Sequence, residues 1–301
     1  MPGAAFTSSY PNGIEPTDPQ PFDSEGKIDI ASTAQGRPLL GFSVNGELIA
    51  TTNRNWTLRA SDYPGVENFS VKAVYGTNFW ADAVNGQESN SGLYECEPKK
   101  YIRSALALTE AGDVVVALPG VYDAEEEAQV HGAGATIRSR VVVPSGRAVR
   151  SRDGADVTRI VGASSPNPTR LNRLGPEAIR CAYLHENSSI EGFTLTDGNT
   201  DSPATGSADG GDDTRGGGVL AANRLTCEVR DCVITNCASL RGGGVALATC
   251  RRCRIVGNTG AHMGTGAYLS RLFRCFADRN DGNQMWFYHP KFGSWMTRIA
   301  V

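Results

Sequence analysis

The feature that most constrains the fold is a short phrase that returns four times between residues 190 and 282. Its copies, read in register, are 191–197, 231–237, 252–258 and 274–280. Cys232 and Cys253 are 21 positions apart, and Cys253 and Cys275 are 22 apart. The first copy aligns Gly192 with Cys232 across an insertion, 198–215. A repeat of this length cannot bury its apolar face alone, so the pattern indicates a solenoid of stacked units.

Glycine-rich phrases keep step with this repeat and begin at Gly216, Gly242 and Gly264. Each unit is too short for a pair of helices and lacks a 3.6-residue apolar stripe, which favours coils of short parallel strands. Stacked coils place equivalent residues about 4.8 Å apart, in ladders. We therefore expect two inward columns, one of Cys232, Cys253 and Cys275, and one of Cys227, Cys250 and Leu272 if a two-residue difference is allowed.

Charge and hydropathy exclude two classes of protein. The chain has 29 basic and 32 acidic residues and a net charge of −3, without the basic balance expected of a nucleic-acid binder. No stretch reaches the roughly 18 consecutive apolar residues of a membrane span. The 35 glycines suit a chain with many tight corners.

The N-terminal part divides into a lead-in and a small module. Residues 1–21 have neither a basic start nor an apolar core, so they predict a flexible lead-in without a readable secretory signal. Residues 22–76 contain strand-like runs with a hairpin signal at Asn45-Gly46, which predicts a small antiparallel β module. This module resembles the Ig-like or bacterial-repeat modules of surface proteins.

Residues 78–122 carry a sharper resemblance. A strand-like run from Asn78 is followed by 101–108 at helical spacing and then by a segment that ends in Pro119-Gly-Val-Tyr122. This order is similar to the opening of bacterial β-helix proteins of the pectin-lyase-like superfamily. The likeness implies an all-β chain with a right-handed parallel β-helix over 77–282 and an irregular C-terminal tail or cap over 283–301. The helix would cover the first coil with Ile102, Ala105, Leu106 and Leu108.

Eight cysteines leave two interpretations open. The relatives are extracellular, which favours disulfides. Neighbouring positions of an inward ladder have parallel Cα–Cβ vectors, however, and this is poor disulfide geometry, so we expect stacked free thiols. Cys250 and Cys253 have the spacing of a metal-binding pair, but no second pair completes a zinc site.

The insertion 198–215 and its flank concentrate carboxylates and end in an arginine. The aspartates are Asp197, Asp201, Asp209, Asp212 and Asp213. They could hold Ca²⁺, as the resemblance to β-helix pectate lyases implies, or form a solvated loop whose aspartates satisfy turns. Arg215 and Arg241 each precede a glycine triplet and should stack on neighbouring coils. There they would contact an anion such as a uronate, pair with the aspartates of the loop, or simply face water.

No catalytic site is identifiable from the sequence. Asp201 and Asp212 superficially resemble two motifs of the β-helical polygalacturonases, but those motifs belong on successive coils and here share one insertion. No Ser or Cys nucleophile lies in a recognisable elbow. The histidines are scattered, at His131, His185, His262 and His289.

We therefore expect a secreted or cell-surface scaffold, structural, adhesive or glycan-binding, that acts as a monomer. Its partner would be an extracellular polysaccharide or a host or cell surface, with no nucleic acid and no cofactor apart from a possible Ca²⁺. The alternative is a lyase or hydrolase that acts on an acidic, pectin-like polysaccharide beside the aspartate-rich loop. Whether the chain is an enzyme stays open at this stage.

Overall fold

The structure is a computed structural model that describes residues 5–6, 24–31, 39–51, 55–67, 69–75, 77–124, 127–131, 135–202, 211–281 and 285–286. The chain divides into two compact units, Met1–Asn78 and Phe79–Val301. No helix within the described ranges has the length and apolar character that crossing a membrane would require.

The first unit is built from short, mostly antiparallel strands. Its larger sheet has the order β1-β6-β3-β4, with β1 (Ala5–Phe6), β6 (Ser70–Tyr75), β3 (Leu39–Val44) and β4 (Glu47–Ala50). A second sheet pairs β2 (Lys27–Ala31) with β5 (Asn55–Arg59), which leads into the 3₁₀ turn η1 (Ala60–Asp62). The predicted small antiparallel β module is confirmed, with one parallel pair between β1 and β6.

The predicted hairpin lies where the sequence places it, between β3 and β4. Asn45 and Gly46 both have positive φ, 50° and 94°, as the twist of a two-residue hairpin requires. The ring of Phe42 stacks on Trp56 with centroids 5.3 Å apart, next to buried Phe69. This unit therefore has its own small apolar core.

The second unit contains three long sheets. Sheet 1 contains β7 (Asn78–Ala81), β8 (Val114–Ala117), β12 (Ala148–Ser151), β15 (Ser189–Glu191), β18 (Glu228–Arg230), β22 (Thr249–Arg251) and β26 (Arg271–Phe273). Sheet 2 contains β9 (Gly120–Tyr122), β13 (Thr158–Val161), β16 (Thr194–Thr196), β19 (Val233–Thr235), β23 (Arg254–Val256) and β27 (Phe276–Asp278). Sheet 3 contains β10 (Glu127–His131), β11 (Ala135–Val143), β14 (Arg180–Leu184), β17 (Val219–Ala221), β21 (Val245–Ala246), β25 (Ala267–Tyr268) and β28 (Met285–Trp286).

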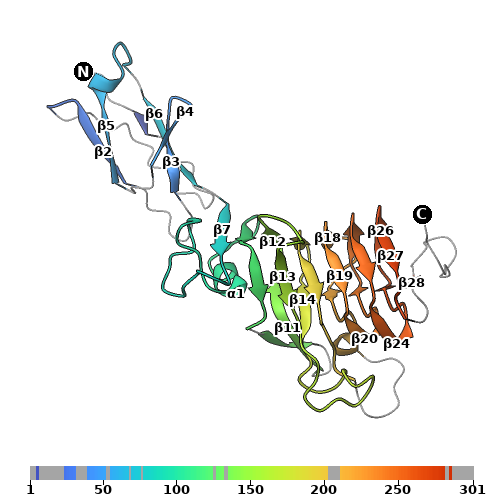
Figure 1. Ribbon diagram of the computed structural model, residues 1–301. Coiled ribbons are helices and arrows are strands. Elements are labelled where there is room, and N and C mark those ends of the chain that lie inside the picture. Colours follow the sequence, from blue (N-terminus) through green and yellow to red (C-terminus); the bar gives the residue numbers. More distant parts are fainter. Residues whose placement is uncertain are drawn as a thin grey trace. The chain divides into compact units, whose positions relative to one another are not determined.

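In the first coil, β10 and β11 form an antiparallel pair within sheet 3. From β12 onward the chain visits the three sheets in turn, and each round adds one strand to each sheet. From β8 to β27, neighbouring strands of sheets 1 and 2 pair in parallel, and so do β11 to β28 of sheet 3. A short parallel pair of β20 (Ala238–Arg241) and β24 (Thr259–Met263) joins the later coils. The strands of successive coils lie side by side in Figure 1. The unit is a parallel β-helix, which confirms the predicted fold class.

A short helix lies against the first coil. Helix α1 (Ile102–Leu106) buries Ile102, Ala105 and Leu106 in the same apolar cluster as the interior of the coils. Leu108 is half-buried and packs on that cluster. The four inward residues predicted from helical spacing are therefore the ones that cover the coil.

The cysteine column is real, but the first copy of the repeat is shifted by one residue. The amide of Arg254 donates to the carbonyl of Cys232, and that of Phe276 to the carbonyl of Cys253, both at 2.9 Å. The same pattern places Phe193, and not Gly192, next to Cys232. Gly192 instead shares the preceding corner with Asp231, where φ is 76° and 49°. The predicted alignment of Gly192 with Cys232 is therefore wrong. The corner is defined by its left-handed backbone, which both Gly and Asp adopt here, so residue type does not identify the equivalent position.

The second predicted column also needs correction. Cys250 pairs with Val229 on one side and with Leu272 on the other, and Val229 pairs with Ile190. Cys227 lies two residues earlier and is buried at the corner, where its Sγ lies 3.2 Å from the carbonyl of His185. Cys227 therefore does not belong to this column, and Val229 takes the place predicted for it. The predicted pairing of Cys250 with Leu272 is correct.

The glycine triplets mark close contact between coils as well as tight corners. Gly242 opens its triplet with φ of 66°. A Cβ atom on Gly243 would lie 2.2 Å from the carbonyl oxygen of Thr259, and one on Gly244 would lie 2.5 Å from that of Gly266. Neighbouring backbones therefore approach too closely at these two positions for any side chain.

We expect the six buried cysteines to resist alkylation in the folded protein. All eight cysteines are free thiols, and Cys96 is exposed while Cys275 is half-buried. Burial raises the pKa of the Cys181 and Cys232 thiols, which suppresses the reactive thiolate. Labelling with iodoacetamide at pH 8, read by mass spectrometry, should modify Cys96 at least about 100-fold faster than Cys232, because a buried thiol reacts only after local opening. Equal rates in the folded protein would contradict the inward column.

Candidate functional site

The insertion predicted to carry a site connects sheet 2 to sheet 3. It leaves β16 at Asp197 and returns through the 3₁₀ turn η2 (Asp212–Thr214) to β17. Asp209 lies outside the described residues. The described part of the insertion is therefore its two ends, 198–202 and 211–215.

Arg215 and Arg241 lie on neighbouring coils, as the glycine triplets predict. The two residues form an isolated parallel bridge, and the amide of Gly216 donates to the carbonyl of Arg241 at 3.0 Å. Both guanidinium groups lie over the ring of Tyr268, 5.9 and 5.7 Å from its centroid. Arg215 also pairs with Asp212 at 3.1 Å. The two arginines thus form one cationic group at the foot of the insertion.

The four described aspartates form no metal-binding group, and Asp197 lies at a corner with its own partners. Asp197 accepts hydrogen bonds from Thr196 and Asn236, at the corner of the coil. Partial burial, with the nearby charges of Asp201 and Asp212, raises the pKa of Asp213. Among the described residues, no group of three or more His, Cys, Asp or Glu side chains is placed to hold a metal ion. The Ca²⁺ site therefore stays a prediction, which a melting curve with and without a chelator would test.

Arg180 at the start of β14 is one of the residues that the sequence analysis missed. Its side chain is fully buried, and the desolvation lowers its pKa to about 10. Its Nε donates to the carbonyl of Gly216 at 3.2 Å, and its Nη2 lies within hydrogen-bond distance of the carbonyls of Asp212, Asp213 and Arg215. The guanidinium therefore holds the returning end of the insertion by its backbone. This arrangement favours a structural role for the foot of the insertion.

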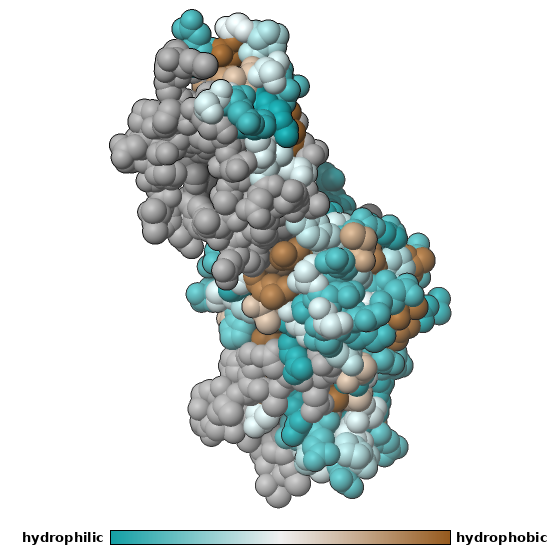
Figure 2. Space-filling model, turned by 90° about the vertical axis from the view of Figure 1, so that its left-hand side faces the viewer, coloured by the Kyte–Doolittle hydropathy of each residue, from teal (hydrophilic) through white to brown (hydrophobic). Residues whose placement is uncertain are grey.

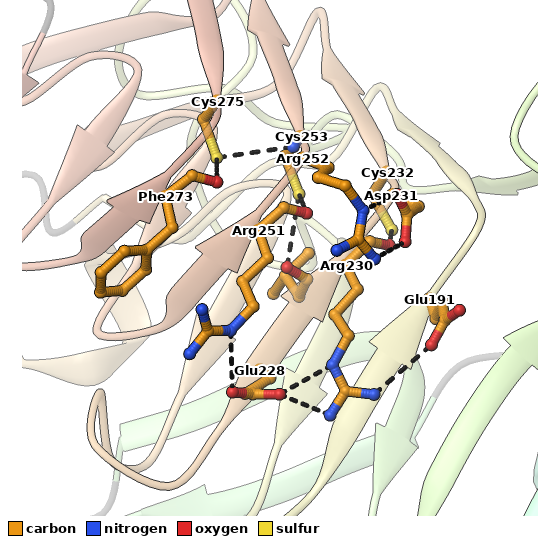
Figure 3. A network of polar contacts seen from close by, with 11 residues as sticks. Glu191, Glu228, Arg230, Asp231, Cys232, Arg251, Arg252, Cys253, Phe273 and Cys275 are labelled. Atoms are coloured by element: carbon orange, nitrogen blue, oxygen red, sulfur yellow. Dashed lines mark hydrogen bonds and ion pairs between the residues drawn. The ribbon is translucent and has the colours of Figure 1, made fainter.

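A second group of charged side chains follows the outer face of sheet 1 (Figure 3). The strand register places Glu191, Arg230, Arg251 and Phe273 in one column on successive coils. Glu228 lies in the adjacent column and accepts hydrogen bonds from Arg230 at 2.7 Å and Arg251 at 3.2 Å. Arg230 also reaches Glu191 at 3.4 Å. These side chains form a continuous ladder of ion pairs across three coils.

Two carboxylates on these coils, Glu228 of the ladder and Asp231 beside it, have lowered pKa values. Partial burial alone would raise the pKa of Glu228, but the hydrogen bonds from Arg230 and Arg251 outweigh that effect and lower the pKa. Arg252 binds both oxygens of Asp231, at 2.7 and 2.6 Å, and lowers the pKa of that carboxyl. A group with a lowered pKa is a poor general acid near neutral pH.

The last two described coils present a different surface, rich in arginine and phenylalanine. We call it the arginine–phenylalanine surface, and it consists of Arg251, Arg254, Arg271, Phe273, Arg274, Phe276 and Arg279. The ring of Phe273 lies between two guanidinium groups, 4.6 Å from that of Arg251 and 5.5 Å from that of Arg271. Phe273 and Phe276 remain 39% and 46% exposed. On a chain of net charge −3, this surface concentrates cations around two exposed rings.

A groove of about 390 Å³ crosses the sheet 2 side of this surface. Arg254, Phe276 and Arg279 line it, together with one carboxylate, Asp278, which accepts a hydrogen bond from Arg279 at 3.2 Å. Arg254 and Arg274 have no ion pair with any described residue. On the face seen in Figure 2, the described surface is mostly hydrophilic with scattered hydrophobic patches.

An enzyme of the alternative class is expected to have a groove in which two carboxylates, or a carboxylate and an Arg or Lys, converge from different coils. Glu191 and Glu228 come from successive coils, but both are ion-paired on an outer face. The described groove holds one carboxylate, Asp278, together with Arg254 of the neighbouring coil, and Asp278 is already paired with Arg279. His185 packs edge-on against Tyr183, and His262 lies 3.1 Å from Arg170. The side chains of His131 and His289 are outside the described part. No catalytic residue is therefore assigned.

No protein-family model matches the chain, and no curated protein matches it. Among solved structures, it is similar to pectin methylesterase PemA from Erwinia chrysanthemi, with a TM-score of 0.36 and 10% identity over 68% of this chain and 67% of that chain. A likeness this distant carries no argument about what the chain binds or does.

Proposed function

We propose that the protein is an extracellular or cell-surface scaffold that binds an extended acidic polysaccharide on the arginine–phenylalanine surface. The observation that carries this proposal is Phe273, which stays exposed while two arginines lie over its ring. Arginine recognises carboxylates through two parallel hydrogen bonds, and an exposed aromatic ring offers an apolar face to a sugar ring. The surface therefore combines the two contacts that a uronate needs.

The spacing of the coils supports a polymer rather than a single sugar. Arg251 and Phe273 belong to one outward column, and Arg254 and Phe276 belong to another on the next sheet. Neighbouring strands lie about 4.8 Å apart, so the side chains form a regular series along the solenoid. A polyanion that lies along this series meets several arginines at once, and their attraction adds up.

Nucleic acid fits the observations less well. It is also a polyanion, but domains that bind it usually carry a strong basic excess, whereas this chain has a net charge of −3. The surface uses arginine and no lysine among its members, which suits planar acid groups. A single-stranded DNA is therefore an informative competitor in the test.

The test is binding of polygalacturonate, measured by surface plasmon resonance, with its fully methyl-esterified form as the uncharged counterpart. We expect Arg254→Gln combined with Arg274→Gln to weaken binding at least about 10-fold, because two charged contacts are lost. Arg159→Gln is the matched control, since Arg159 is exposed in the same outward column as Arg254 but three strands away. It should leave binding unchanged.

Three outcomes would overturn the proposal: binding that ignores Arg254 and Arg274, equal affinity for the methyl ester, or tighter binding of single-stranded DNA. The same mixtures, assayed for released oligosaccharides with and without a chelator, test the lyase or hydrolase alternative. Calcium-dependent cleavage that is lost in Asp212→Ala and Asp213→Ala would place the function at the insertion instead.

A further inference from the structure

The groove on sheet 2 runs along the solenoid, across three successive strands. Val256 of β23 pairs with Thr235 of β19 on one side and with Asp278 of β27 on the other, and all three line the groove. The adjacent outward column adds Arg254 and Phe276, which also pair with each other. With strands about 4.8 Å apart, this lining extends over roughly 10 Å along the solenoid. A ligand in the groove therefore contacts several coils at once, as one stretch of a polymer does.

The described lining of the groove carries one net positive charge. Its cations are Arg254 and Arg279, and its carboxylate is Asp278. The Nε of Arg279 lies 3.2 Å from Asp278 in an ion pair, so these two charges offset each other. Arg254 is exposed and has no ion pair with any described residue. The groove therefore attracts one acidic group, at Arg254, and presents a carboxylate to whatever lies beside that group.

The volume of the groove corresponds to about two sugar rings. A cavity of about 150 Å³ accommodates benzene, a six-membered ring without substituents. The groove measures about 390 Å³, which leaves room for two substituted rings. Two rings in a row along the groove would meet Arg254 on β23 and then Phe276 with Asp278 on β27. Room for two rings and a single net positive charge call for one acidic sugar next to one neutral sugar.

We propose that the polysaccharide bound here alternates uronic acid residues with neutral sugar residues. The uronate carboxylate pairs with Arg254. The neutral ring packs on Phe276, and its hydroxyl groups donate hydrogen bonds to the carboxylate of Asp278. This inference rests on the proposed polysaccharide binding and narrows the polymer to an alternating class.

A homopolymer of uronates would bring a second carboxylate next to Asp278. Like charges repel there, and Arg279 cannot offset both because it is already paired with Asp278. The rest of the arginine–phenylalanine surface works in the opposite direction, since exposed Arg271 and Arg274 attract a densely charged polymer. Fragments just long enough to fill the groove separate these two effects.

The experiment measures binding of tetrasaccharide fragments to the full chain by isothermal titration calorimetry. Fragments of hyaluronan alternate glucuronate with a neutral N-acetylated sugar, and fragments of polyglucuronate carry an acid on every ring. We expect the hyaluronan fragment to bind at least about 5-fold more tightly, because the second acid of the other fragment faces Asp278.

Asp278→Asn is the decisive variant. We expect it to raise the affinity for the polyglucuronate fragment at least about 5-fold, because the repulsion is removed and Arg279 becomes available. The affinity for the hyaluronan fragment should change less than about 2-fold, because asparagine still accepts a hydrogen bond from a hydroxyl group.

Asp153→Asn is the matched control. Asp153 pairs with its neighbour Arg152 on an earlier coil, as Asp278 pairs with Arg279, and it lies outside the groove. Its replacement should leave both affinities unchanged.

The inference is overturned if the polyglucuronate fragment binds as tightly as the hyaluronan fragment, or if Asp278→Asn leaves the preference unchanged. Binding of polygalacturonate without binding of either fragment would place the contact outside the groove and overturn this inference alone. If neither the fragments nor polygalacturonate bind, the proposed polysaccharide binding itself fails, and this inference fails with it.

Discussion

Replacing Gly243 by alanine should prevent the β-helix from folding stably. The added Cβ would lie 2.2 Å from the carbonyl oxygen of Thr259 and 2.7 Å from that of Thr265. Both are backbone atoms of the next coil, so no side chain can move aside to relieve the overlap. Ordinary overpacking costs about 1–3 kcal/mol, and separating two stacked backbones should exceed that range.

Gly257→Ala is the matched control for this change. Gly257 also lies in these coils, but with φ of 64° and with only Thr235 Oγ1 near the added atom, at 3.7 Å. Its replacement should therefore cost only about 1–2 kcal/mol, from the left-handed backbone. Urea unfolding of both variants checks the difference. The close stacking of coils would be refuted by equal loss of stability in the two proteins.

Replacing Arg180 by methionine should release the returning end of the insertion and destabilise the β-helix. Methionine fills similar space but cannot donate to the carbonyls of Asp212, Asp213, Arg215 and Gly216. Each buried carbonyl that loses its donor and finds no other costs about 1–3 kcal/mol. We therefore expect a lower urea midpoint, together with faster amide hydrogen exchange over residues 211–216.

Arg215→Met separates this effect from a general loss of charge. Arg215 makes one ion pair with Asp212, whose side chain is 41% exposed, and such pairs contribute about 0–1 kcal/mol. Its replacement should leave exchange over 211–216 nearly unchanged. If both variants behave alike, the backbone contacts of Arg180 do not hold the insertion.

The period of the repeat predicted the solenoid because the inward residues recur with little variation. Cys232, Cys253 and Cys275 occupy one column, and the structure confirms it. The errors in the predicted register arose at corner positions, where the structure accepts several residue types. Gly192 and Asp231 share a left-handed corner that Arg252 and Arg274 also occupy, with φ near 50°, so composition gives no guide to register there.

The foot of the insertion and the arginine–phenylalanine surface differ in how far they could be predicted from the sequence. Arg215 and Arg241 precede recognisable glycine triplets, which placed them together. Arg180 escaped notice because its partners are main-chain carbonyls more than 30 residues away, and these leave no trace in side-chain identity. The arginine–phenylalanine surface was missed for another reason. Outward arginines look like an ordinary solvated face until the strand register brings them next to Phe273 and Phe276.

The turn that follows sheet 2 is the place where the β-helix can take up inserted residues. In the later coils, Asn258 and Asn280 seal this turn from inside, because Asn258 Nδ2 donates to the side chain of Asn280 and to the carbonyl of Ile234, both at 2.9 Å. In the preceding coil, Cys237 occupies the equivalent place and its amide donates to Asn258. The long excursion 198–215 leaves from the same turn one coil earlier and returns to strand β17 in step with its neighbours. New segments inserted at this turn can therefore vary in length during evolution, or carry a grafted peptide, while the coils beneath them stay in register.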